Sequence, residues 1–226
     1  MLDRLTYVRA SYFDKGKSSV QIAKMAEEQV KEQRSSYHHG DLRGALIRAT
    51  RQLIEEKGRD NFSVSDACRL AGVSTAAPYK HFKNKEEMVE GAVLDAMARH
   101  YVELQDDLSA HEKGTRERII AMGRNYVTFA LKEPGMFQLR FANMDSNEDD
   151  EVQNSGKLVY GLVQEEVRAA LGEPEITPLV VERSYYLWCF VHGLSYLSMV
   201  PQLAEKGPEM TLDQMLGGVT DRILAA

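Results

Sequence analysis

The chain contains few of the residues that form disulfides or metal sites. It has two cysteines among 226 residues, and Cys68 and Cys189 stand far apart in apolar helical contexts. We therefore expect two buried free thiols in a reducing compartment, with a redox-sensing pair as the alternative. There is no CxxC pair or histidine cluster, and the acidic run 145–151 lacks the glycine and glutamate of a calcium loop. The sequence predicts no metal and no cofactor.

Long apolar runs and strand patterns are also missing. The longest bulky apolar run, 185–191, is far shorter than the ~20 residues that a membrane span needs. The first residues, MLDRLTYVRASYF, carry charges throughout and lack the apolar core of a signal peptide. We therefore expect an all-α protein that is soluble and cytoplasmic. No Ser, Cys or carboxylate pair stands in a recognisable catalytic arrangement, which disfavours an enzyme.

Charge is unevenly distributed along the chain. The net charge is −6, but residues 1–85 hold 16 Lys and Arg against 10 Asp and Glu, whereas residues 86–226 hold 12 against 24. A basic front end on an acidic body orients a molecule toward nucleic acid. By itself the imbalance is equally well explained as ordinary scatter.

The segment 62–88, FSVSDACRLAGVSTAAPYKHFKNKEEM, has the pattern of a helix-turn-helix. Ser63 and Asp66 have the spacing of a capping box, which predicts a short helix from 64 to about 71. Gly72 suits the left-handed conformation that ends such a helix. Two short helices joined by a tight turn present the second one to the major groove of DNA.

The second helix of this motif is predicted to begin at Ser74 or Thr75 and to reach Phe82. An earlier start is excluded, because Pro78 is tolerated only within the first turn of a helix. A third helix is predicted to start at Lys85, where the free backbone N–H groups and the helix dipole favour an anion.

Side chains around this motif suit contacts with DNA. Small residues let the second helix approach base edges, while hydroxyl, ammonium and imidazole groups donate to phosphate oxygens. Residues 34–40 are predicted to form an arm whose arginine enters the minor groove, or else a solvated linker. The predicted DNA contacts are Arg34, Ser63, Ser74, Thr75, Ala76, Tyr79, Lys80, His81 and Lys85.

Helical periodicity continues along the rest of the chain. Residues 1–34 form an extension that the sequence leaves open as a marginal helix or an unstructured segment. Residues 35–85 are predicted to form the DNA-binding domain, and residues 86–226 a second helical domain. The remaining helices are predicted at 42–57, 85 to about 108, 115–132, a short piece after Gly135, 152–171, 178–200 and 212–224.

The segment 37–100 resembles the N-terminal domain of the TetR (tetracycline repressor) family of bacterial transcription regulators. The resemblance rests on Gly72, on the Tyr79-x-His81-Phe82 group, and on Lys85 with the acidic residues after it. It implies a C-terminal region that binds a small-molecule effector and dimerises, and a DNA affinity that changes when the effector binds. Such regulators are usually repressors that bind palindromic operators.

A second, weaker match lies at 188–194. The pattern Trp188-x-x-x-His192-Gly193-Leu194 is similar to a signature in the C-terminal region of one TetR subgroup. The helix that carries it is apolar on all sides, which predicts that a second chain covers it. A homodimer with the last two helices of each chain in a four-helix bundle explains this pattern.

Large side chains in the C-terminal half suit a cavity for an apolar or aromatic effector, since they come from four helices that must converge. Core packing explains the same pattern, and His192 is also typical of a structural histidine. The candidate ligand residues are Tyr126, Phe129, Phe137, Phe141, Met144, Tyr160, Trp188, His192 and Met199.

The sequence thus predicts a ligand-responsive regulator that binds double-stranded DNA in a bacterial nucleoid. The alternative is a DNA-binding architectural protein of the same fold without a small-molecule switch. A filled core without a cavity would favour that alternative.

Overall fold

The computed structural model describes residues 41–142 and 151–225, and every regular element in these two ranges is a helix. The all-α fold predicted from the sequence is confirmed. In chain order the elements are α3 (Leu42–Lys57), α4 (Val64–Ala71), the 3-10 helix η1 (Pro78–Lys80), α5 (Lys85–Ser109), α6 (Arg116–Lys132), α7 (Pro134–Ala142), α8 (Glu151–Leu171), α9 (Pro178–Met199), α10 (Pro201–Ala204) and α11 (Leu212–Leu224). The predictions for residues 1–34, for the arm with Arg34, for Met144 and for the acidic run up to residue 150 lie outside the described residues.

Local capping sets most of these helix ends. The side chain of Asp41 accepts a hydrogen bond from the Gly44 backbone N–H at 2.8 Å, which starts α3 at the predicted residue. Asn84 caps α5 in the same way through Glu87. Threonines cap the later helices α6, α9 and α11. These short-range signals explain why the predicted and observed helices agree closely.

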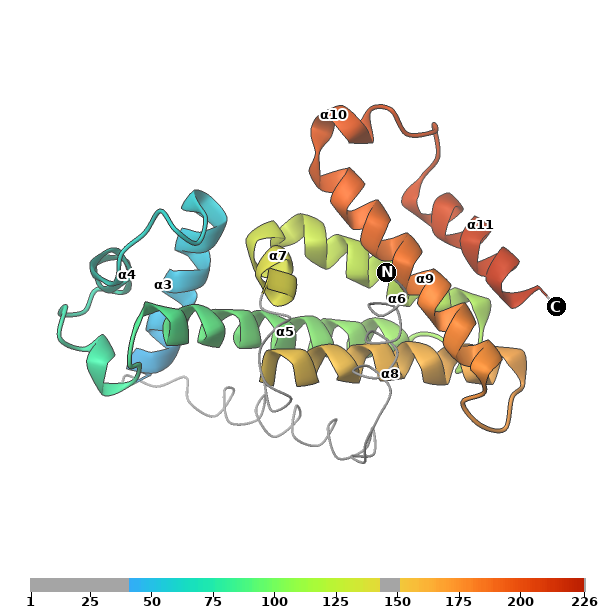
Figure 1. Cartoon of the computed structure of the whole chain (residues 1–226), viewed down its shortest axis with the longest axis horizontal. Coiled ribbons are helices and arrows are strands. Elements are labelled where there is room, and N and C mark those ends of the chain that lie inside the picture. The colour runs from blue at the N-terminus through green and yellow to red at the C-terminus, as the bar shows by residue number, and fades with distance from the viewer. Residues whose placement is uncertain (1–40, 143–150, 226) are drawn as a thin grey trace, which may run out of the picture.

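The helices α3 and α4 and the 3-10 helix η1 lie at one end of the molecule, and α5 runs from them into the body (Figure 1). We call α3, α4, η1 and the first turns of α5 the reading head. Its core contains Leu46, Leu53, Phe62 and Phe82, all of which are buried. The same apolar cluster continues without a break into α6 and α7. The reading head is therefore packed directly onto the body.

The body is built from helices that pack on α5 and on one another. α8 lies along α5, and α9 packs on α6 and α8 (Figure 1). α11 packs on α6 and α9 at the end opposite the reading head, where ion pairs join Arg116 to Asp221 and Arg124 to Asp213. None of the helices in the described ranges has the length and apolarity that crossing a membrane requires.

The predicted second helix of the helix-turn-helix is wrong in its extent. Residues from Ser74 onward form a turn, and only the short 3-10 helix η1 follows. Ala77 N–H bonds Ser74 O at 3.0 Å, but Pro78 has no N–H with which to continue an α-helical ladder. Pro78 therefore stands at the start of η1, a full turn later than predicted.

One further prediction is corrected. Cys68 is buried as expected, but Cys189 is exposed on α9. One side of α9 is open within the single chain, where Tyr186 is 49% exposed and Leu197 is 51% exposed, and its cover by a second chain stays a prediction. The short helix α10 had no prediction.

Candidate DNA-reading head and aromatic cluster

A complete capping box shapes the first helix of the helix-turn-helix. Asp66 N–H donates to Ser63 Oγ at 3.2 Å, while Ser63 N–H donates to Asp66 Oδ2 at 2.9 Å. The Ser63 hydroxyl also donates to this carboxylate, and these bonds lower the pKa of Asp66 to about 2. At the other end Gly72 has φ 70°, the left-handed conformation predicted for it.

The predicted contact residues after this turn share one exposed segment. The buried Pro78 anchors the segment on the core, while Tyr79 beside it is 66% exposed. Because these hydroxyl, ammonium and imidazole donors lie on a short exposed segment, they are accessible to the phosphate groups of a nucleic acid. The exposed members of the predicted set are Ser63, Ser74, Thr75, Ala76, Tyr79, Lys80 and His81.

Lys85 occupies the first position of α5 and is partly buried. Its Nζ lies 4.2 Å from the centre of the Phe62 ring, which is a cation–π arrangement. The ring holds the ammonium against Phe62, beside the first turn of α4. Arg43 makes a similar contact, with its guanidinium 5.3 Å from the Phe82 ring. Arg43 was not among the predicted DNA contacts, although it is a basic residue in the first turn of α3.

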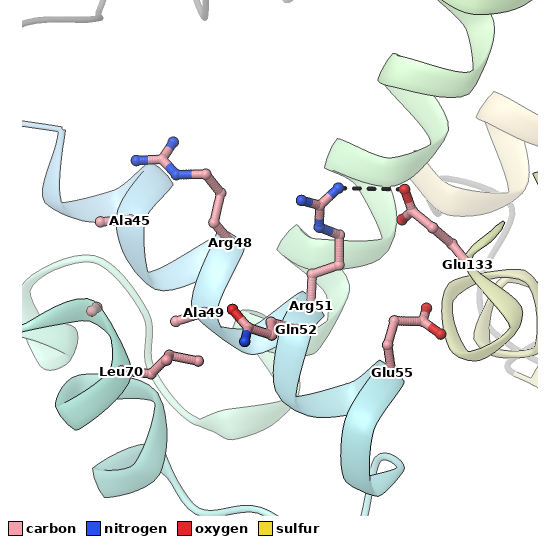
Figure 2. Close-up of a pocket in the computed structure, with 9 residues that line it drawn as sticks. Ala45, Arg48, Ala49, Arg51, Gln52, Glu55, Leu70 and Glu133 are labelled. Carbon is pink, nitrogen blue, oxygen red and sulfur yellow. Dashed lines mark hydrogen bonds and ion pairs between the residues drawn. The ribbon is translucent and has the colours of Figure 1, made fainter.

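A groove of about 660 Å³ lies where the reading head meets the body. Figure 2 shows its wall on α3, with Arg51 joined to Glu133 and with Glu55 pointing toward the same corner. Glu133 connects α6 to α7, and its carboxylate also accepts from Arg99 at 2.7 and 2.9 Å. Burial opposes ionisation of Glu133, but the arginine contacts outweigh it and the pKa lies below its usual range.

An aromatic cluster fills the centre of the body. Phe137 on α7 is 0% exposed, and its ring lies 5.5 Å from Tyr126, 5.4 Å from Phe141 and 5.6 Å from His192, centre to centre. His192 on α9 in turn contacts Trp188 at 5.9 Å. The structure therefore brings these predicted ligand residues together, and their rings pack directly against one another.

Other predicted ligand residues lie at the edge of this cluster. Phe129 is buried and contacts Phe137, while Tyr160 is partly exposed and contacts Trp188 at 5.6 Å. Met199 packs against the same core from the end of α9. His100, which the sequence reading missed, stacks on Phe129 at 4.3 Å, and its burial lowers its pKa to about 3.

A short hydrogen-bonded chain runs through the cluster. Trp188 Nε1 donates to Tyr126 Oη at 3.3 Å, and Tyr126 Oη lies 2.9 Å from His192 Nδ1. Burial lowers the pKa of His192, so the imidazole is neutral near pH 7. Because an indole N–H can only donate, Tyr126 Oη is the acceptor of the bond from Trp188. A neutral imidazole has one donor and one acceptor nitrogen, so His192 adds both kinds of group to the cluster.

Family models match both parts of the chain. The model of bacterial regulatory proteins of the tetR family matches residues 46–92, and that of the tetracyclin repressor-like C-terminal domain matches residues 119–219. The chain belongs to the TetR family. Its helix-turn-helix is therefore the DNA-binding part of a TetR-type regulator, and the family and the fold are those of DNA-binding proteins.

Curated relatives include nucleoid occlusion factors. The SlmA protein of Photobacterium profundum is 25% identical over 138 residues, which is 59% of this chain and 68% of that protein. The SlmA protein of Vibrio campbellii is similar to the same degree. At 25% identity, both are distant relatives of this chain.

Solved structures share the fold at low sequence identity. A protein of unknown function from Rhodococcus sp. RHA1 superimposes with a TM-score of 0.67 at 24% identity, covering 84% of this chain and 96% of that one. The transcriptional regulator FadR from Bacillus subtilis, solved in complex with stearoyl-CoA, has a TM-score of 0.60 at 14% identity and covers 80% and 97%. These likenesses show the fold.

Proposed function

We propose that the chain is a ligand-responsive transcription repressor that binds a palindromic operator as a homodimer in the bacterial cytoplasm. The observation that carries the proposal is the exposed donor segment of the reading head, packed on a body whose centre is a cluster of aromatic rings. In this arrangement one end can contact DNA while the other responds to an effector.

Contact roles at the reading head follow from position. Thr75 and Ala76 lie in the exposed turn and are assigned to base edges, because small side chains permit close approach. Tyr79, Lys80 and Lys85 are assigned to phosphates. His81 and the hydroxyls of Ser63 and Ser74 are assigned to phosphates as well.

The exposed side of α9 supports a homodimer. Tyr186, Cys189, Tyr196 and Leu197 lie on it at helical spacing, and each is exposed in the single chain. A second copy of α9 and α11 would cover this face in a four-helix bundle. The two reading heads would then stand about 34 Å apart, one turn of B-DNA, or adapt to that spacing. Sedimentation that finds a monomer at micromolar concentration would contradict the dimer.

The effector is assigned to the aromatic cluster. A ligand that enters there must displace packed rings, so it should itself be apolar or aromatic. It should also carry a polar group that can hydrogen-bond the His192 imidazole. FadR of the same fold was solved in complex with stearoyl-CoA, whose stearoyl chain is long and apolar.

Genome-wide footprinting tests the function, because the bound sites and their neighbouring genes identify both operator and effector. Trp188 then reports binding directly. Stearoyl-CoA and a panel of aromatic acids should perturb its fluorescence at the concentrations that release the recovered DNA. A probe that changes the fluorescence and leaves DNA affinity unchanged would contradict the proposal that the aromatic cluster regulates DNA binding.

A second candidate is a nucleoid-associated DNA-binding protein without a small-molecule switch. The SlmA relatives and the direct ring-to-ring packing of the cluster favour it. Footprints spread over the chromosome with no probe that releases them would select this candidate.

A further inference from the structure

The short helix α7 begins against α3 of the reading head, and its later residues lie in the aromatic cluster. We propose that Glu55 of α3 is a positioning residue that couples the two regions by holding the N-terminus of α7. This inference rests on the proposed function, and it names the contact through which an effector reaches the DNA-contacting segment.

Glu55 supplies the hydrogen bonds that α7 needs at its start. Its Oε2 accepts from Gly135 N–H at 2.9 Å and its Oε1 from Met136 N–H at 2.9 Å. Pro134 has no N–H, and Phe137 N–H bonds Glu133 O at 2.9 Å. The backbone donors of the first turn of α7 are therefore accounted for, two of them by one carboxylate from another helix. A negative charge at this end is also favoured by the helix dipole.

The residue before α7 is also held against the reading head. Glu133 is held by Arg51 of α3 at 3.3 Å and by Arg99 of α5. Gly135 lies so close to α3 that an added Cβ would stand 3.0 Å from Ile54 Cγ2 and 3.1 Å from Glu55 Oε1. An ion pair, two hydrogen bonds and close packing therefore hold the start of α7 against α3.

The other end of α7 cannot move independently of the cluster. Phe137 follows Met136 directly and is fully buried among the rings, and Phe141 lies one turn further, 4.7 Å from His192. A ligand that displaces these two rings must move α7. The helix then either carries Glu55 and α3 with it or breaks both bonds to the carboxylate. Either result changes how α3 is held relative to the body.

Coupling is reciprocal, so the test needs no effector. DNA bound to the full-length protein should alter the environment of Trp188, which contacts His192. The experiment measures acrylamide quenching of Trp188 with and without a duplex selected by the protein from a random-sequence pool. In the wild type, the duplex should change the quenching constant.

Glu55→Ala should abolish most of this change, reducing it by more than roughly half, since both bonds to α7 are lost. Glu55→Gln keeps an acceptor oxygen without the charge and should give an intermediate value. Glu56→Ala is the matched control, because it removes the same charge from the next residue, whose carboxylate accepts from Gln52 within α3. Gly135→Ala perturbs the same contact from the α7 side and should also reduce the change.

Thermal unfolding of each variant separates a structural role from a coupling role. A merely structural Glu55 would lower stability and leave the DNA-induced change of folded protein intact, which would overturn the inference. It would equally be overturned if Glu55→Gln and Gly135→Ala both behave as Glu56→Ala. A wild type that binds the duplex with no change at Trp188 overturns the coupling alone. A wild type that binds no duplex overturns the proposed function as well.

Discussion

The reading head and the aromatic cluster use side chains in opposite ways. At the head the residues proposed to act are exposed, apart from the partly buried Lys85, and buried neighbours such as Pro78 hold them in place. In the cluster the residues proposed to act are themselves the core, with Phe137 fully buried. Function can therefore be altered at the head with little loss of stability, whereas in the cluster packing and binding depend on the same atoms.

The largest expected effect follows from this difference. Phe137→Ala should lower the free energy of unfolding by about 3–5 kcal/mol, because it removes a buried ring from contact with several others. Urea denaturation measures the change. Leu131→Ala, at an exposed position of α6, is the control and should cost no more than about 0.5 kcal/mol. Equal costs for the two variants would show that the cluster is not a packed core.

Lys85→Ala should have its effect on DNA and little on folding. Loss of the proposed phosphate contact should weaken binding to all sequences and lower the salt slope of binding by roughly one unit per half-site. Tyr79→Phe should weaken binding in the same unspecific way. Lys113→Ala, in the exposed turn after α5, is the control. If Lys85→Ala leaves affinity and slope as they are in the control, the phosphate assignment is wrong.

Ser63→Ala should lower the free energy of unfolding by about 1 kcal/mol, since it removes the hydroxyl that caps α4.

The carboxylate of Asp66, which bonds Ser63, makes the stability of this region sensitive to acid. Because the pKa of Asp66 lies at about 2, below the 3.8 of an unperturbed aspartate, its contribution is complete above pH 3.8. It is lost as the pH falls through 3.8 to about 2. The stability difference between wild type and Asp66→Asn should shrink across this window, and a constant difference would contradict it.

Thr75→Ala should have the smallest effect, a loss of discrimination between DNA sequences by a few-fold at about constant affinity for unrelated DNA. Binding to the selected duplex and to single-base variants of it measures this. A uniform loss over all sequences would move Thr75 from the base-contact class to the phosphate class.

Local signals made the helix ends predictable. Asp41, Ser63 and Asn84 each bond a backbone N–H three residues ahead, so their spacing is visible in the sequence. The prediction for the second helix-turn-helix element, from Ser74 or Thr75 to Phe82, was wrong in its extent. Its premise was that Pro78 would fit within the first turn of an α-helix, but Pro78 has no N–H to continue the ladder and begins the 3-10 helix η1 instead.

Long-range contacts limited the prediction of the site. The bond from Gly135 to Glu55 joins residues 80 apart, and no local pattern marks it. The aromatic residues predicted as ligand contacts do lie together, and their role in binding stays a prediction. Their arrangement around His192 depends on how α6, α7 and α9 converge, which periodicity does not specify.

Hydrogen–deuterium exchange of the full chain with and without its selected duplex tests the central claim most directly, because it reports both regions in one measurement. Coupling through α7 predicts that DNA slows exchange in 63–85 and also changes exchange in 134–141, with α11 unaffected. Protection confined to 63–85 would contradict the account, since the reading head would then bind DNA independently of the aromatic cluster.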